Sequence, residues 1–297
     1  MSLVRDDAAS DSVDNAKALT VQIPNGVNMQ PSWYNAGNVT LGWDLMKPYP
    51  DIGSVRFMVE PSITVAQVKK WISQTASNGY VIMVAYDDYS GGLQGSDDSS
   101  KLQAAAQWWV AHYNDLAASG TFVLNLANEW GSHDITSDAY AAAYNQAIAT
   151  VRQVYSGLIV IDCPGYGQET VVARDASAKL EDNNLAFSLH VYPDSYNQGH
   201  GTYLDIEDLD DLEASGRPWL VGEFGDKGDV EAKVDWRAIT LRAKALSRPL
   251  LGWSWNGDGA EMNMLTPSWK DDPSATVYTR TAYFDKIYKV LAAGEVV

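Results

Sequence analysis

Short apolar segments alternate with longer amphipathic segments along most of the chain. The apolar segments are rich in Val, Ile and Leu, and Gly, Pro, Asp or Asn residues bound them, which is typical of buried β-strands. On this pattern we predict strands at 25–29, 54–59, 80–86, 122–127, 158–162, 185–192, 219–224 and 250–255.

Helical patterns fill the intervals between the predicted strands. The segment 64–79 begins with an N-cap candidate, Thr64, and ends at Gly79, a residue type that commonly terminates helices. Comparable patterns lie at 99–120, 137–157, 204–215, 229–247 and 273–293.

Strands that alternate with helices indicate a parallel sheet, and eight such units match a closed (β/α)8 TIM barrel. An open doubly wound sheet is the structural alternative, but it normally carries a glycine-rich phosphate turn after its first strand. The segment GVNMQPSW, which begins at Gly26, has no such turn. We therefore predict an α/β fold with a single (β/α)8 TIM-barrel domain over 21–297, preceded by a disordered or loosely packed segment over 1–20.

Composition narrows the possible partners. The formal net charge of −17 disfavours nucleic acid and anionic membranes, which are themselves polyanions. The single cysteine, Cys163, excludes an intrachain disulfide and a cysteine-based zinc site. The chain has 11 Trp and 16 Tyr but only 5 Phe. Trp and Tyr combine an apolar body with a polar edge, which suits the apolar face and polar rim of a sugar ring.

The beginning of the sequence, MSLVRDDAAS, is polar and has no apolar signal core. We nevertheless expect a secreted protein whose signal peptide precedes this sequence. No apolar run is long enough to span a membrane, and we expect a monomer.

Two glutamates stand at predicted strand ends, where a barrel places its active site. Glu129 follows the fourth strand and Glu223 lies in the seventh, so both face one cavity in a closed barrel. A pair of carboxyl groups in one cleft can cleave a glycosidic bond if one is protonated and the other ionised. Arg56, within the second strand, is a candidate partner that lowers the pKa of the ionised one.

The motifs around these residues resemble glycoside hydrolase family 5, in the bacterial β-mannanase branch. GVNMQPSWY, SVRFMV, FVLNLANEWG, CPGYGQ, FSLHVY, VGEFG and GWSWNGDG occur in the family's order and at compatible spacing. The resemblance extends from about Gly26 to about Leu265, which is most of the chain.

The resemblance implies a retaining endo-β-glycosidase that hydrolyses β-1,4-mannan. Glu129 would be the general acid/base and Glu223 the nucleophile, with carboxyl groups about 5–5.5 Å apart. Asn128 would hydrogen-bond the sugar 2-OH, while Arg56 and Tyr192 would orient the nucleophile. No metal and no organic cofactor is implied.

The resemblance also implies roles for residues around this pair. His190 would lie beside the two carboxyl groups, and Trp255, with Trp253, would stack under the sugar at the cleavage point. Trp130 is adjacent to the acid and is expected in the cleft. Trp33 follows the first strand and is a candidate for a distal sugar subsite.

One motif departs from the family pattern. The third strand of bacterial mannanases usually ends in His-Asp, but here Tyr86 replaces the His, and Asp87 remains. Because Tyr does not titrate near neutral pH, this departure puts the substrate preference in doubt more than the reaction.

Other interpretations stay open. The same mechanism could act on cellulose or a mixed β-glucan, and a non-catalytic carbohydrate-binding barrel is a third possibility. Arg56 could form a structural salt bridge, His190 could be a core histidine, and Asn128 could cap a turn. The acidic run DIEDLDDLE at 205–213 is interpreted as a solvated helix face; it lacks the glycine-containing loop of calcium sites.

Overall fold

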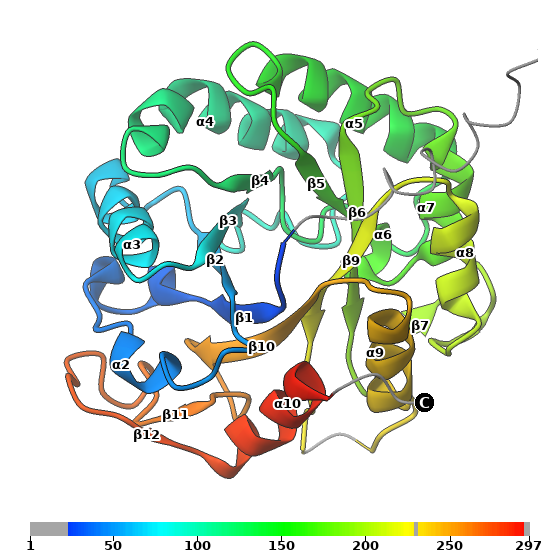
Figure 1. Cartoon of the computed structure of the whole chain (residues 1–297). Helices are drawn as coiled ribbons and strands as arrows, with labels where there is room; N and C mark the ends of the chain where they lie inside the picture. The colour runs from blue at the N-terminus through cyan, green and yellow to red at the C-terminus, as the bar shows by residue number, and fades with distance from the viewer. Residues whose placement is uncertain (1–22, 229–230, 294–297) are drawn as a thin grey trace, which may run out of the picture.

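Parallel strands close into a barrel with helices around it (Figure 1). The computed structural model describes residues 23–228 and 231–293, so the predicted segment 1–20 lies outside the described residues. The barrel strands, in their order around the barrel, are β1 (Gly26–Met29), β2 (Ser54–Val59), β3 (Val81–Tyr86), β4 (Val123–Asn125), β5 (Ile159–Asp162), β6 (Leu185–Val191), β9 (Trp219–Phe224) and β10 (Leu250–Asn256). β10 pairs with β1 and closes the barrel, which confirms the predicted TIM-barrel fold.

Most predicted helices form close to their expected positions. The longer helices are α3 (Val65–Ser77), α4 (Ser99–Ala117), α5 (Ser137–Val151), α7 (Thr170–Ser177), α8 (Asp208–Ala214), α9 (Trp236–Ala245) and α10 (Ala282–Ala292), and of these α7 was not predicted. Thr64 caps α3 as predicted, because its hydroxyl accepts a hydrogen bond from the Gln67 amide. The predictions for α9 and α10 began too early, since loops precede both helices.

Several short elements were not predicted. They are the helices α2 (Trp43–Met46) and α6 (Pro164–Gly167), the 3-10 turns η2 (Pro31–Trp33) and η3 (Asn35–Gly37), and the hairpins β7 (Tyr196–Asn197) with β8 (Thr202–Tyr203) and β11 (Leu265–Thr266) with β12 (Thr279–Arg280). All are too short for hydrophobic periodicity to reveal. No described helix has the length and apolar character of a membrane span.

The barrel interior changes from apolar to polar along the strands. Near the strand starts, an apolar cluster fills the interior: Met83, Val160, Ala186, Leu220 and Leu251. Toward the strand ends the buried side chains become polar, among them Arg56, Asn125, Asp162 and His190. The apolar layer closes the bottom of the barrel, and the polar layer forms the floor of a site at its C-terminal face.

Candidate active site

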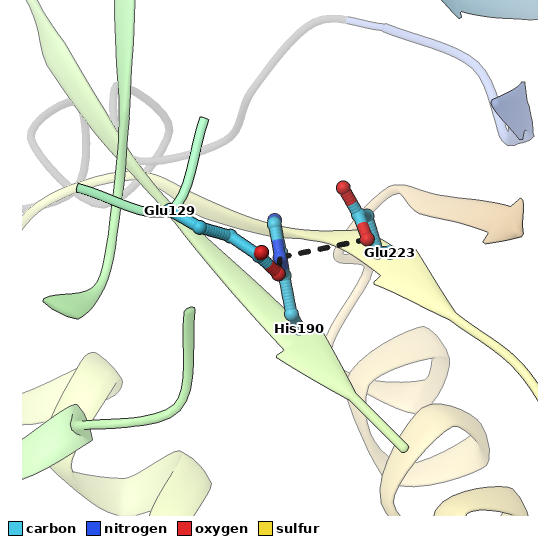
Figure 2. A group of neighbouring side chains, drawn as sticks. All are labelled: Glu129, His190 and Glu223. Atoms are coloured by element: carbon cyan, nitrogen blue, oxygen red, sulfur yellow. Dashed lines mark hydrogen bonds and ion pairs between the residues drawn. The ribbon is translucent and has the colours of Figure 1, made fainter. Parts of the chain in front are cut away.

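The fold brings Glu129 and Glu223 together across the top of the barrel (Figure 2). One oxygen of each carboxyl group and one nitrogen of His190 all lie within 4.8 Å of one another. The His190 Nδ1 atom is 2.8 Å from Glu129 Oε1 and 3.7 Å from Glu223 Oε2. The two carboxyl groups that the sequence placed at separate strand ends therefore share one site.

A turn in the backbone directs Glu129. β4 ends at Asn125, and Glu129 itself has a positive φ of 53°. Such a conformation is uncommon outside glycine, and strained residues of this kind persist where the surrounding structure holds them. Here the Glu129 N–H donates a hydrogen bond to Asp162 Oδ2 at 3.0 Å. The segment thus ends its strand and turns sharply at the carboxylate that faces the cleft.

Two neighbours hold Glu223 in a fixed orientation. Arg56 Nη1 donates to Glu223 Oε1 at 2.7 Å, and the Tyr192 hydroxyl donates to Oε2 at 2.7 Å. Both carboxylate oxygens are therefore occupied by donors, which fixes the plane of the group before any ligand binds.

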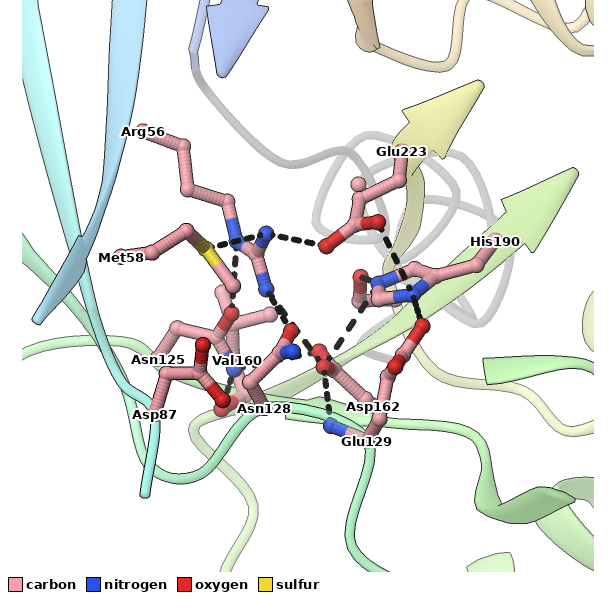
Figure 3. Close-up of polar contacts among 12 residues, drawn as sticks. Arg56, Met58, Asp87, Asn125, Asn128, Glu129, Val160, Asp162, His190 and Glu223 are labelled. Atoms are coloured by element: carbon pink, nitrogen blue, oxygen red, sulfur yellow. Dashed lines mark hydrogen bonds and ion pairs between the residues drawn. The ribbon is translucent and has the colours of Figure 1, made fainter. Parts of the chain in front are cut away.

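Arg56 connects this carboxylate to the rest of the floor (Figure 3). Its guanidinium also donates to Asn128 Oδ1 at 2.7 Å, to Asn28 Oδ1 at 3.0 Å and, through Nε, to Asn125 Oδ1 at 2.9 Å. The side chain is fully buried. Arg56 does form buried salt bridges, one to Glu223 at 2.7 Å and a longer one to Asp162 Oδ2 at 3.5 Å.

The geometry around His190 depends on a glycine. A Cβ atom on Gly167, which has a φ of 82°, would lie 2.4 Å from the His190 ring. Only glycine allows the loop after β5 to approach the imidazole this closely. His190 is fully buried, with Nε2 lying 3.5 Å from Asp162 Oδ2.

Burial and charge shift several pKa values in the floor. Burial raises the pKa of Glu129 and the charge of Glu223 raises it further, although the hydrogen bond with His190 opposes this. For His190 burial lowers the pKa, but the negative charges of Glu223 and Asp162 outweigh it and raise the value to about 9. Burial, together with the charge of Glu60, raises the pKa of Asp87 to about 8.

A cleft of about 430 Å³ lies above this floor. It contains many of the predicted site residues, namely Trp33, Asp87, Asn128, Glu129, Tyr192, Glu223 and Trp253. Arg56 and His190 lie beneath it and contact the two glutamates from below. The Trp33 Nε1 donates a hydrogen bond to Glu60. The side chain is nevertheless 40% exposed, and part of the indole lines the cleft.

Trp255 does not lie in the cleft, which corrects the prediction that it stacks under the sugar. Its ring is fully buried, and its Nε1 donates to the Leu41 carbonyl at 2.9 Å. The pairing of β1 with β10 shifts register between Gly252 and Asn256, the segment that holds both tryptophans, so their two side chains do not share a face as regular alternation requires. Of these two tryptophans, only Trp253 lines the cleft.

Trp130 and Tyr86 also lie elsewhere. Trp130 is 1% exposed, donates to the Asp98 carbonyl and packs edge-on against Tyr144. Tyr86 is buried against Trp108 of α4. Side chains alternate along a strand. Ala85 and Asp87 therefore face the barrel interior, while Tyr86 faces the surrounding helices.

The structure adds residues that were not predicted as parts of the site. Asp162 ends β5 and is the last residue of the predicted strand 158–162, but because Asp commonly stands at strand ends this position does not by itself indicate a site residue. Others come from loops and from the short strand β7 and carry no periodic signal: Gln30, Gln94, His133, Gln168, Asp194, Tyr196, Lys227 and Met262.

Two groups of described side chains have the geometry to hold a metal ion. One is Glu129 with His190 and Glu223, whose atoms are already joined by hydrogen bonds within the floor. The other is His200 with Asp208 and Asp211, on the loop after β6 and on α8.

Comparison with known proteins places this geometry in context. The family model described as Cellulase (glycosyl hydrolase family 5) matches residues 6–259. A Streptomyces lividans protein named mannan endo-1,4-beta-mannosidase is 29% identical over 212 residues, covering 68% of this chain and 53% of the relative. A Cellvibrio japonicus protein of the same name is 25% identical, covering 67% of this chain and 46% of that protein. The chain thus spans about half the length of these curated relatives.

Solved structures share the fold at lower identity. A β-mannanase from Streptomyces thermolilacinus with mannohexaose superposes with a TM-score of 0.71 at 19% identity, covering 92% of this chain and 94% of that one. The catalytic domain of a Thermobifida fusca endoglucanase gives 0.69 at 15% identity, with 92% of each chain covered. The family model extends over most of the sequence, and the chain belongs to glycosyl hydrolase family 5.

Proposed function

We propose that this protein is a retaining endo-β-1,4-mannanase. The observation that carries the proposal is the pairing of Glu129 and Glu223, with one oxygen of each within 4.8 Å. Retaining glycosidases place their carboxyl groups about 5–5.5 Å apart, whereas inverting enzymes need about 6.5–9.5 Å to admit a water molecule. The close pair favours a covalent route.

The charges of the floor support a division of roles between the two glutamates. The floor holds two cations, Arg56 and the protonated His190. They balance the two carboxylates of Asp162 and Glu223, which accept hydrogen bonds. Ionisation of Glu129 adds a third negative charge without a third cation, which agrees with its raised pKa. Glu129 is then the proton donor and Glu223 the nucleophile.

The reaction follows from these roles. Glu223 attacks the anomeric carbon and forms a glycosyl ester, while Glu129 donates its proton to the departing oxygen. Ester formation removes the negative charge of Glu223, which had raised the pKa of Glu129. Glu129 therefore becomes a better base at the moment when it must take a proton from water.

Asn128 is suited to bind the sugar. Arg56 donates to the Asn128 oxygen at 2.7 Å, so Nδ2 is the atom of this amide that can donate to a hydroxyl group. Trp253 and Trp33 supply aromatic surface at the cleft wall.

The preference for mannan rests on similarity, since both curated relatives carry the mannosidase name. An endoglucanase is the second candidate, because an endoglucanase catalytic domain superposes almost as well as the mannanases. The polysaccharide substrate, a secreted location and a monomeric state in solution are parts of the same proposal.

The test is release of reducing sugar from galactomannan, glucomannan, carboxymethyl-cellulose and xylan, together with the anomeric form of the first product by NMR. Activity on both mannans with a β-anomeric product is expected. Activity on cellulose alone would contradict the mannan assignment, and an initial α-anomer would contradict the covalent mechanism.

A further inference from the structure

A lysine lies over the ring of the tyrosine that holds the proposed nucleophile. Lys227 Nζ is 4.9 Å from the centroid of the Tyr192 ring, and the Tyr192 hydroxyl donates to Glu223 Oε2 at 2.7 Å. Among the described residues that line the cleft, Lys227 alone is a lysine or an arginine. Lys227 thus reaches the Glu223 carboxylate through a single intervening side chain.

An ion pair holds the lysine at this place. Both carboxylate oxygens of Asp194 accept hydrogen bonds from Lys227 Nζ, at 2.9 Å and 3.1 Å. Asp194 lies in the loop after β6, two residues beyond Tyr192, whereas Lys227 lies in the loop after β9. The two side chains are 33% and 44% exposed, so the pair adds little stability. Its effect is to fix where the positive charge lies.

The backbone brings these two loops together around the tyrosine. The N–H groups of Lys233 and Val234 both donate to the Pro193 carbonyl, at 2.8 Å and 3.1 Å. A Cβ atom on Gly225 would lie only 3.2 Å from the Tyr192 ring, so a glycine lets the β9 loop pass close to it. The tyrosine is 7% exposed and is enclosed by the loop that carries the lysine.

The lysine acts on the tyrosine in two ways. A cation over the face of an aromatic ring is attracted to it, which restrains the position of the ring. The positive charge also polarises the phenol and makes its hydroxyl a stronger donor to Glu223. Burial, with the charges of Glu223 and Glu129, raises the pKa of Tyr192 well above its ordinary value. The hydroxyl therefore keeps its proton and remains a donor.

We propose that Lys227 is a positioning residue for the reaction, which acts through Tyr192 on the orientation of Glu223 and is held in place by Asp194. This inference rests on the proposed function, in which Glu223 is the nucleophile. Lys227 acts on the carboxylate and not on the sugar. Its loss should therefore lower kcat and leave KM nearly unchanged.

The test is a double-mutant cycle between Lys227→Met and Tyr192→Phe, with hydrolysis of mannohexaose as the assay. Methionine keeps much of the length of the side chain and removes its charge. In the wild-type background Lys227→Met should lower kcat about fivefold. In the Tyr192→Phe background it should lower kcat by less than about twofold, because phenylalanine has no hydroxyl to direct. Lys227→Arg should retain kcat within about twofold of the wild type, since a guanidinium also pairs with a carboxylate and an aromatic ring.

Lys286→Met is the matched control. Lys286, on α10, pairs with Asp226 of the same loop at 2.9 Å, and this pair is also partly exposed. Its loss removes a comparable ion pair without uncovering Tyr192 and should leave kcat unchanged. Melting temperatures verify that every variant is folded.

Three outcomes would overturn the inference: Lys227→Met lowers kcat equally in both backgrounds, it changes KM alone, or Lys286→Met lowers kcat as much. These outcomes leave the proposed function intact. If Glu223→Ala keeps wild-type turnover, the proposed function fails, and this inference fails with it.

Discussion

The floor of the cleft and its rim are built differently. In the floor, Arg56 and His190 are fully buried, and each carboxylate oxygen of Glu223 has its own donor. On the rim, Trp33 and Tyr166 are 40% and 43% exposed and come from turns rather than from barrel strands. The floor is thus fixed before a ligand arrives, while the rim offers open surface. Preorganised charge favours chemistry, and open aromatic surface favours binding.

The largest effect is expected from Glu223→Ala. Loss of the nucleophile should lower kcat by about 10⁵-fold, as in other enzymes that lose a covalent catalyst, while polysaccharide binding persists. Hydrolysis of a soluble manno-oligosaccharide measures the loss, and azide should restore turnover with an α-glycosyl azide as product. The control is Glu231→Ala, an exposed carboxylate outside the cleft. If Glu223→Ala retains wild-type turnover, the nucleophile has been assigned wrongly.

Glu129→Gln should have the next largest effect. Removal of a general acid typically costs about 10²–10⁴-fold in rate. The loss of rate should be severe for mannan. It should be small for formation of the glycosyl-enzyme from an aryl mannoside, because the leaving group of that substrate needs no proton. Comparing kcat/KM for the two substrates measures this difference. An equal loss for both substrates would show that Glu129 does not protonate the leaving group.

Asp87→Asn should affect stability in a pH-dependent way. The pKa of Asp87 is about 8 in the folded protein and about 3.9 when unfolded, so folding favours the protonated form. Its stabilising contribution is complete below about pH 4 and is lost as the pH rises through 8. The neutral amide avoids this loss, which is on the order of a few kcal/mol.

Melting temperatures at pH 5 and pH 8.5 test this expectation. The variant should gain stability relative to the wild type at the higher pH, and the raised pKa of His190, present in both proteins, cancels from the comparison. If the difference in melting temperature between the variant and the wild type is the same at both pH values, Asp87 does not titrate in this range.

The smallest effect is expected on the rim. Trp33→Ala should raise KM several-fold, since an aromatic contact contributes on the order of 1 kcal/mol, and should leave kcat within about twofold. Kinetics on mannohexaose measure both constants. Tyr86→His is the control, because Tyr86 faces α4 and should not alter the ratio of mannan to glucan activity. A large fall in kcat for Trp33→Ala would show that this rim residue contributes to the chemical step as well as to binding.

The sequence by itself determined the barrel and the two glutamates. Hydrophobic periodicity located every barrel strand, because a strand buried on both faces must be continuously apolar. Glu129 and Glu223 interrupt that pattern at strand ends, where a parallel barrel directs side chains into one space. Arg56 was visible for the same reason, as a charge inside an apolar strand.

The tertiary structure decided which side chains enter the cleft. Trp253 and Trp255 are indistinguishable in sequence, and a register shift between β1 and β10 separates them. Tyr86 is removed from the cleft by alternation along β3, and Trp130 by the turn at Glu129. Asp208 and Asp211 appear as solvated charges until α7 and the β7–β8 hairpin pack over them. Periodicity reports burial along one segment, whereas these outcomes depend on contacts between segments far apart in the chain.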